Sequence, residues 1–218
     1  DARVRALDPA WFQGRHVLDI GCNAGYVTVT IGNKYAPAHI LGVDIDEELV
    51  RQAWSHLRHR WSLYRPGVPE TEAAGDEEAG DAVNDAEDYP ISMPAMFGSM
   101  PLPPRRRETV EQFPLNVSFQ AHDWLRSPPE PGTYDVILAL SVTKWIHLHH
   151  GDDGMRSFFH KVYASLRPGG RFVLEPQPWS SYTRKSKLTE KMRTIYQGIS
   201  FRPDAFQEFL LDRVGFAS

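Results

Sequence analysis

Short apolar runs alternate with segments of helical spacing along most of the chain. The apolar runs predict five strands, at residues 16–20, 40–44, 117–121, 134–140 and 171–175. The segments beside them predict helices at about residues 26–34, 46–63 and 154–166. Nearly continuous apolar strands that alternate with helices are typical of a parallel sheet covered on both faces. The pattern therefore predicts an α/β fold with a doubly wound, mostly parallel sheet and helices on both faces.

Residues 65–107 interrupt this pattern. They contain seven prolines and several glycines and alanines, and their first part, residues 65–90, carries nine acids against one base, Arg65. A segment of this composition buries too little apolar surface to offset the entropy lost on ordering. We expect residues 65–107 to form a flexible acidic and proline-rich insertion within one domain spanning residues 1–218, and an ordered surface loop is the alternative.

The acidic segment changes the meaning of the net charge. The whole chain has a formal charge of −4, and residues 65–90 alone contribute −8. The rest of the chain therefore carries +4. The acidity of the whole chain does not exclude binding to nucleic acid, because it belongs to one segment.

Cysteine content and hydropathy argue against a disulfide-linked secreted protein and against a membrane-spanning protein. The one cysteine, Cys22, cannot form an internal disulfide or a cysteine-based zinc cluster, which favours a reducing compartment such as the cytosol or the nucleus. No window approaches the roughly 18 consecutive apolar residues of a membrane-spanning helix, and the first residues lack the pattern of a secretory signal. We therefore expect no membrane partner.

A glycine-containing turn follows the first predicted strand. It reads DIGCNAG from Asp19 to Gly25. Glycines at positions 21 and 25 allow a tight turn and a close approach of the backbone to a ligand at the edge where open α/β sheets bind ligands. A dinucleotide dehydrogenase would carry G-x-G-x-x-G, and Cys22 and Asn23 do not fit that pattern, which disfavours NAD. A tight turn without a ligand is the remaining alternative.

Polar side chains follow the other strands at the same edge. Asp44 ends the second strand, where a carboxylate can accept hydrogen bonds from two ribose hydroxyls. Asp123 and Trp124 follow the third strand and combine an acceptor for an adenine amine with an aromatic face, although a core position is the alternative for Trp124. Ser141 follows the fourth strand. These strand ends together predict a nucleoside-binding crevice.

Two later stretches carry a family resemblance. They are LSVTKWIHL, which ends at Leu148, and LEPQPWSSY, which ends at Tyr182, with GDDG at 151–154 between them. The crevice resembles that of class I S-adenosylmethionine-dependent methyltransferases. The two stretches resemble the RNA methylphosphate capping enzyme family, and the resemblance runs from about Arg3 to the C-terminus apart from the insertion. It implies a Rossmann-like class I methyltransferase fold.

The resemblance also implies a reaction and a cofactor. Members of that family transfer a methyl group from S-adenosyl-L-methionine to the terminal γ-phosphate of a 5′-triphosphate on a small noncoding RNA, and release S-adenosyl-L-homocysteine. The positions that match the family's cofactor contacts are Arg3, Gly21, Cys22, Asn23, Asp44, Ile45, Asp123, Trp124 and Leu140. The family has Asn-Tyr more often at positions 123 and 124, and the residues here preserve an acceptor and an aromatic ring.

The chemistry of this reaction depends mainly on placement. A terminal phosphate has a second pKa of about 6, so its oxygen is already a nucleophile at neutral pH and no general base is needed. The site must align the reacting atoms and hold the triphosphate with cations against its own repulsion. Lys144, just past the fourth strand, is the candidate catalytic residue, and a solvated surface lysine is the alternative.

Basic residues gather after Tyr182, where the sequence continues as TRKSK. Dense positive charge beside an aromatic ring suits the phosphates and the first base of an RNA end, although a solvated basic face is the alternative. The candidate RNA-contacting residues are Lys144, His147, Tyr182, Arg184 and Lys185.

A histidine-rich stretch superficially resembles a metal site. Its members are His147, His149, His150, Asp152 and Asp153. We expect no metal, because the family needs none and its motif already includes His147.

Three classes of function fit parts of the sequence. The first is an RNA 5′-γ-phosphate methyltransferase that acts in the nucleus, is monomeric by itself and has other ribonucleoprotein subunits as partners. The second is an RNA-binding assembly subunit of a small noncoding ribonucleoprotein, in which catalysis is dispensable. A small-molecule methyltransferase is the third, and it does not explain EPQPWSSY or the basic run. The family also has a tyrosine-rich segment before Arg3 and antiparallel strands after residue 218, and we expect these elements to be missing.

Overall fold

Five parallel strands form the centre of the structure. The computed structural model describes residues 2–63, 96, 98–104 and 112–217. The strands are β1 (His16–Ile20), β2 (His39–Asp44), β3 (Val117–Ala121), β4 (Tyr134–Leu140) and β5 (Leu166–Glu175). They pair in the order β3-β2-β1-β4-β5, and every pairing is parallel. The order reverses direction at β1 and β4, so the doubly wound parallel sheet predicted from the sequence is confirmed.

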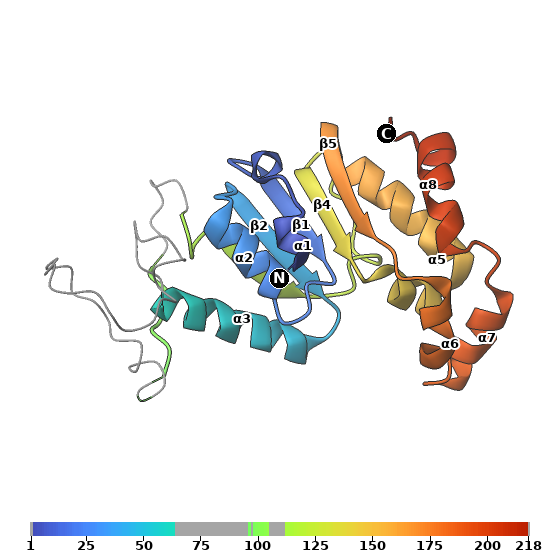
Figure 1. The fold of residues 1–218 in the computed structure, drawn as a ribbon, viewed down its shortest axis with the longest axis horizontal. Coiled ribbons are helices and arrows are strands. Elements are labelled where there is room, and N and C mark those ends of the chain that lie inside the picture. The colour runs from blue at the N-terminus through green and yellow to red at the C-terminus, as the bar shows by residue number, and fades with distance from the viewer. Residues whose placement is uncertain (1, 64–95, 97, 105–111, 218) are drawn as a thin grey trace, which may run out of the picture.

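Helices cover both faces of the sheet (Figure 1). The helices are α1 (Ala2–Arg5), α2 (Tyr26–Lys34), α3 (Glu47–Ser62), α5 (Thr143–Ser165), α6 (Tyr182–Lys185), α7 (Glu190–Gly198) and α8 (Phe206–Phe209). Successive residues of β1 point to opposite faces: Val17 packs in one core cluster with Ile31 of α2 and Leu57 of α3, and Leu18 packs in another with Phe159 of α5. This alternation explains why the strands are apolar on both faces.

The helix that follows β4 is longer than the sequence predicts. The predicted helix from about residue 154 corresponds to the second part of α5, and a further helical segment that begins at Thr143 precedes it across a kink at Gly151, where φ is 65°. Gly151 has a non-helical conformation and separates the two helical segments. Leu148 and Met155, on either side of the kink, are both fully buried. The side chains of residues 143–150 therefore lie on a helix that begins at the ligand-binding edge of the sheet.

A third, smaller core cluster attaches the C-terminal helices to the start of α5. It consists of Leu148, Tyr182, Met192 and Ile199, which come from α5, α6, α7 and the residue after α7. Trp145, Trp179 and Tyr196 pack against it, and the rings of Trp179 and Tyr196 stack with centroids 4.9 Å apart. This cluster places residues 176–185 beside the first turn of α5.

Most of the predicted insertion lies outside the described residues. Residues 65–95, 97 and 105–107 belong to that part, so their predicted flexibility stays a prediction. Of residues 98–104, Met100 donates its backbone N–H to Ser62 Oγ at 2.6 Å, and Leu102 packs against the core cluster on the α3 side of the sheet. This part of the segment is therefore attached to the fold. Within the described ranges, no helix has the length and apolar character needed to span a membrane.

Candidate active site

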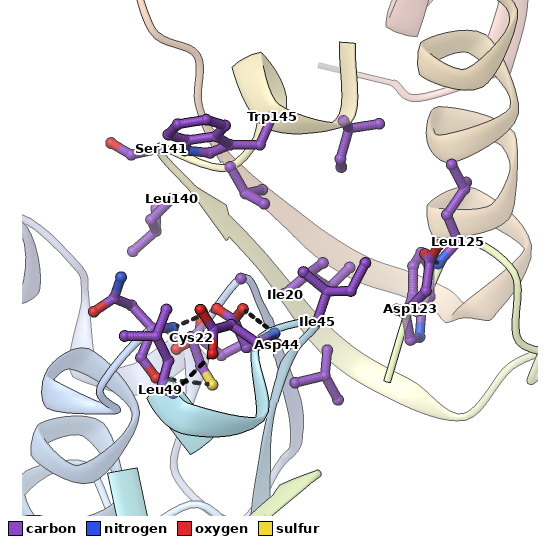
Figure 2. A pocket seen from close by; sticks show the side chains of 18 of the residues that line it. Ile20, Cys22, Asp44, Ile45, Leu49, Asp123, Leu125, Leu140, Ser141 and Trp145 are labelled. Carbon is purple, nitrogen blue, oxygen red and sulfur yellow. Dashed lines mark hydrogen bonds between the residues drawn. The ribbon is translucent and has the colours of Figure 1, made fainter. Parts of the chain in front are cut away.

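A cavity of about 700 Å³ opens at the carboxyl ends of β1, β2 and β4 (Figure 2). All of the residues predicted to contact the cofactor line it: Arg3, Gly21, Cys22, Asn23, Asp44, Ile45, Asp123, Trp124 and Leu140. Figure 2 shows Cys22 and Asp44 on one side of the space, with Ser141 and Trp145 on another and Asp123 and Leu125 across from Asp44. Residues that are far apart in the sequence thus meet around one ligand-sized space.

The turn after β1, which lines the cavity, depends on the backbone conformation of Gly21. This residue has a φ of 74°, and a Cβ atom there would lie 2.5 Å from Val142 Cγ2. Only glycine fits both the conformation and the space. Asn23 also has a positive φ, 52°, and its backbone N–H donates to Asp44 Oδ2 at 2.8 Å. The turn after β1 is therefore tied to the end of β2.

Asp44 retains capacity for a ligand at the end of β2. Its Oδ1 accepts the backbone N–H of Asp46 at 3.1 Å, and its Oδ2 accepts that of Asn23. A carboxylate has about four lone-pair sites, so two acceptor positions remain. The next residue, Ile45, is 70% exposed and lines the cavity, where its apolar side chain can cover one face of a bound ring. This arrangement suits a nucleoside with two vicinal hydroxyls.

Asp19 is a cavity residue that was not among the predicted cofactor contacts. Its side chain is buried and accepts a hydrogen bond of 2.6 Å from Thr28 Oγ1. Burial raises the pKa of Asp19 to about 6, and the hydrogen bond from Thr28 and the charge of Arg3 oppose this rise. The carboxyl group therefore changes charge near neutral pH, at the floor of the cavity.

Trp124 is mainly a core residue. Its side chain is 5% exposed, and its ring meets the ring of Phe158 edge to face at 6.0 Å. Lys161 Nζ lies 4.4 Å from the centre of the Trp124 ring and also donates to the backbone carbonyl of Trp124. The core alternative therefore describes most of this side chain, and its predicted contact with an adenine stays a prediction. Asp123 is half-buried beside it and accepts the N–H of Leu125 at 3.1 Å.

Lys144 lies next to the cavity rather than in its wall. Its neighbour Trp145 lines the cavity, and Lys144 Nζ and Lys185 Nζ lie 5.8 Å and 5.3 Å from the centre of the Trp145 ring. Burial lowers the pKa of Lys144, and the positive charges of Lys185 and Arg184 lower it further. Three of the predicted RNA-contacting residues thus form one basic cluster, Lys144, Arg184 and Lys185, at the edge of the cavity.

His147 and Tyr182 are corrected as RNA contacts. Both side chains are fully buried, so neither reaches a ligand at the surface. His147 Nε2 lies 3.0 Å from Asp152 Oδ1, and its ring meets that of Tyr182 edge to face at 5.8 Å. Burial lowers the pKa of His147 and raises the pKa of Tyr182 to about 12, so both side chains are neutral at pH 7. They support the start of α5 and do not provide charge for RNA.

Asp152 joins this buried histidine to the segment after α7. Its Oδ2 accepts from the Ser200 N–H at 3.1 Å, the Ser200 hydroxyl at 2.7 Å and the Phe201 N–H at 3.0 Å. Burial favours the neutral acid, but these bonds and the one to His147 hold the pKa of Asp152 at about 2. Among the residues that the structure describes, no group of three or more His, Cys, Asp or Glu side chains is arranged to hold a metal ion.

Further cavity residues come from α5 and α7. They are Trp145, Ile146, His149, His150 and Lys191. Trp145 and His149 are four residues apart, so they share one face of a helix. This signal would have found them if the helix had been predicted to begin at residue 143. Lys191 follows the basic run after Tyr182 in the sequence, and its place at the cavity depends on how α7 packs against α5.

Known proteins that are similar to this chain include RNA methyltransferases from animals and a plant. Residues 134–218 match the family model described as Bicoid-interacting protein 3 (Bin3). The 7SK snRNA methylphosphate capping enzyme of Homo sapiens is 39% identical over 230 residues, which cover 100% of this chain and 33% of that protein. A probable RNA methyltransferase of Arabidopsis thaliana is 39% identical over 217 residues, covering 99% and 66%. The U6 snRNA methylphosphate capping enzyme Amus of Drosophila melanogaster is 33% identical over 217 residues, covering 98% and 59%.

These alignments span nearly all of the chain but only part of each relative. The chain corresponds to between a third and two thirds of the length of these three proteins. Its family resemblance, inferred from the stretches that end at Leu148 and Tyr182, is confirmed by all three alignments and by the family model. The chain belongs to the Bin3 family.

Proposed function

We propose that this chain is the catalytic region of an S-adenosylmethionine-dependent enzyme that methylates the terminal γ-phosphate at the 5′-triphosphate end of a small noncoding RNA. The observation that carries the proposal is that two candidate sites lie next to each other. The cavity, which suits a nucleoside cofactor, is separated only by Trp145 from the basic cluster of Lys144, Arg184 and Lys185. A cofactor and a polyanion bound there would lie side by side.

The residues of the cavity fit S-adenosylmethionine. Asp44 has free acceptor capacity for the ribose, Ile45 offers an apolar surface for the adenine, and Asp19 offers a carboxylate for the positive charge of the methionine part. When bound, this cofactor supplies an electrophilic methyl group on a sulfonium; the phosphate oxygen takes the methyl, and the sulfur keeps the electron pair of the broken bond. The chain does not need a base, because the phosphate oxygen is already ionised at neutral pH.

The contribution of the basic cluster is electrostatic. A 5′-triphosphate carries several negative charges that repel one another. Lys144, Arg184 and Lys185 provide fixed cations for these charges, and their position beside the cavity orients the terminal phosphate toward the methyl group. Catalysis thus consists of alignment and charge compensation.

The wider context is part of the same proposal. We infer that the enzyme acts in the nucleus and works with other ribonucleoprotein subunits. The names of the human and Drosophila relatives specify 7SK and U6 small nuclear RNAs, which supports a small nuclear RNA as the proposed substrate. The chain contains one cysteine, Cys22, which is buried and unpaired, in accord with a reducing compartment.

Methyl transfer should depend on the 5′ end of the RNA. The full-length protein is incubated with methyl-labelled S-adenosylmethionine and with RNAs of one sequence that end in a 5′-triphosphate or a 5′-hydroxyl. We expect label on the triphosphate RNA and none on the hydroxyl RNA. Specific RNA binding with no label on the triphosphate RNA would contradict the proposal and favour an RNA-binding assembly subunit.

Cofactor binding should strengthen as the pH rises through about 6. The pKa of Asp19 is raised to about 6, so its carboxyl is neutral at pH 5 and ionised at pH 7. Only the ionised form attracts the cationic methionine part. Calorimetric titration with S-adenosylmethionine from pH 5 to pH 8 should show affinity rising and then levelling above pH 7, with a total change of about tenfold. Asp19→Asn should remove this dependence, and an unchanged profile in that variant would refute the role of Asp19.

A further inference from the structure

A side chain from the segment after β5 accepts hydrogen bonds from the first turn of α5. The first N–H groups of a helix have no acceptors within the helix. Val142, which precedes α5, provides no side-chain cap. Gln177 takes this place: its Oε1 accepts the Lys144 N–H at 3.1 Å and the Thr143 hydroxyl at 3.0 Å. The helix that carries Lys144 is thus capped by a residue 33 positions away.

The nitrogen of the same carboxamide holds the end of β4. Gln177 Nε2 donates to the carbonyl oxygen of Ser141. Ser141 has a φ of 61°, a left-handed conformation that residues other than glycine rarely adopt. Such a conformation persists where its surroundings hold it in place. Gln177 therefore forms hydrogen bonds with both ends of the turn formed by residues 141–144.

Glu175 holds this turn from the other direction. Its backbone carbonyl accepts the Ser141 N–H at 3.1 Å, and its carboxylate accepts the Ser141 hydroxyl at 2.8 Å. The same carboxylate lies 3.7 Å from the guanidinium of Arg3, which lines the cavity. The stretch Glu175-Pro176-Gln177 thus connects the cavity wall to the start of α5.

We propose that Gln177 is a positioning residue for methyl transfer, because its carboxamide fixes Lys144 at the edge of the cavity. The proposal rests on the function given above, in which Lys144 holds the phosphate. Lys144 Nζ also reaches Ser181 Oγ at 3.4 Å, so one short segment, residues 177–181, holds both the backbone and the side chain of this lysine. Arg184 and Lys185 repel the Lys144 ammonium, and the contacts of its backbone and side chain with residues 177–181 hold it close to them.

Glutamine alone satisfies this geometry. The carboxamide must accept two hydrogen bonds at its oxygen and donate one from its nitrogen. Glutamate has the same shape, but an ionised carboxylate cannot donate to the Ser141 carbonyl and would repel it. Methionine has a similar length and neither function. Gln177→Glu and Gln177→Met therefore disrupt these hydrogen bonds with little change in side-chain volume.

The kinetic constants of these variants test the proposal. In the full-length protein, both should lower kcat for methyl transfer to triphosphate RNA by about 10²-fold, the effect of a misplacement of about 1 Å. The affinity for S-adenosyl-L-homocysteine should fall much less than kcat, because Gln177 does not line the cavity and acts on its wall through Ser141. The matched control is Gln207→Glu on α8, which makes the same change at an exposed glutamine and should leave kcat and KM unchanged.

A double-mutant cycle separates positioning from a general effect on the fold. If Gln177 acts through Lys144, adding Gln177→Met to Lys144→Ala should change kcat less than about threefold. Multiplying losses would overturn the inference, as would variants that match the control. Variants that are unfolded at the assay temperature would assign Gln177 to folding and overturn it too. If the unaltered protein transfers no methyl group, the proposed function fails first and this inference fails with it.

Discussion

Lys144→Ala should lower kcat for methyl transfer to a 5′-triphosphate RNA by about 10²- to 10³-fold. The ammonium of Lys144 lies in the basic cluster with Arg184 and Lys185, beside the ring of Trp145 that lines the cavity. Removing it leaves the triphosphate with one fixed cation fewer, so the terminal phosphate oxygen is less well aligned with the methyl group. The loss should appear in single-turnover experiments with labelled cofactor, since these measure the chemical step directly.

The same variant should bind the cofactor almost normally. Lys144 is outside the cavity wall, so the affinity for S-adenosyl-L-homocysteine should stay within about threefold. Lys34→Ala is the matched control, because Lys34 is an exposed lysine in the last turn of α2. A large loss of cofactor affinity in Lys144→Ala, or an unchanged kcat, would show that the role of Lys144 is misassigned.

The sheet and the location of the site are predictable from the sequence. The strands β1, β3 and β4 begin and end at the predicted residues, because their apolar runs are nearly continuous and are bounded by polar or glycine residues. In a parallel sheet the carboxyl ends of all strands meet at one edge. Asp44 and Leu140, which end β2 and β4, therefore meet in one cavity although they are 96 positions apart in the sequence.

The faces of the helices near the site are less predictable. His147 and Tyr182 belong to stretches that resemble known motifs, and a polar or aromatic residue in a motif suggests a ligand contact. Their burial depends on the long-range packing of α6 and α7 against the start of α5. A local pattern does not contain that information. On the same short helix, Arg184 is exposed and Lys185 is half-buried.

The contacts of the EPQPWSSY stretch show what it does in the structure. Glu175 and Gln177 hold the turn before α5, and Ser181 contacts the side chain of Lys144. Trp179 packs against Tyr182 with ring centroids 4.9 Å apart and so attaches this segment to the third core cluster. The stretch therefore positions Lys144 and the wall of the cavity.

Asp44→Ala should have the opposite kinetic signature to Lys144→Ala: a weaker affinity for the cofactor with kcat largely retained at saturation. The Asp44 carboxylate holds the N–H groups of Asn23 and Asp46 and has two free acceptor positions. Hydrogen bonds to a charged acceptor contribute about 1.5–3 kcal/mol each, so the loss of two ribose bonds corresponds to at least about 100-fold in Kd. Calorimetry with S-adenosyl-L-homocysteine measures this change, and Asp212→Asn, at an exposed aspartate, is the control.

The loss of ribose hydrogen bonds must be distinguished from a rearranged turn, since Asp44 also holds the N–H of Asn23. Asp44→Asn keeps the size of the side chain, and a 2′,3′-dideoxy analogue of S-adenosyl-L-homocysteine removes the hydroxyls from the ligand instead. The unaltered protein should bind the analogue at least about 100-fold more weakly than the parent compound, whereas Asp44→Ala should bind both with similar affinity. Asp44→Asn should lie between them, because an amide oxygen accepts more weakly than a carboxylate. If the unaltered protein does not discriminate between the two ligands, Asp44 does not bind the ribose, and its role is limited to holding the turn after β1.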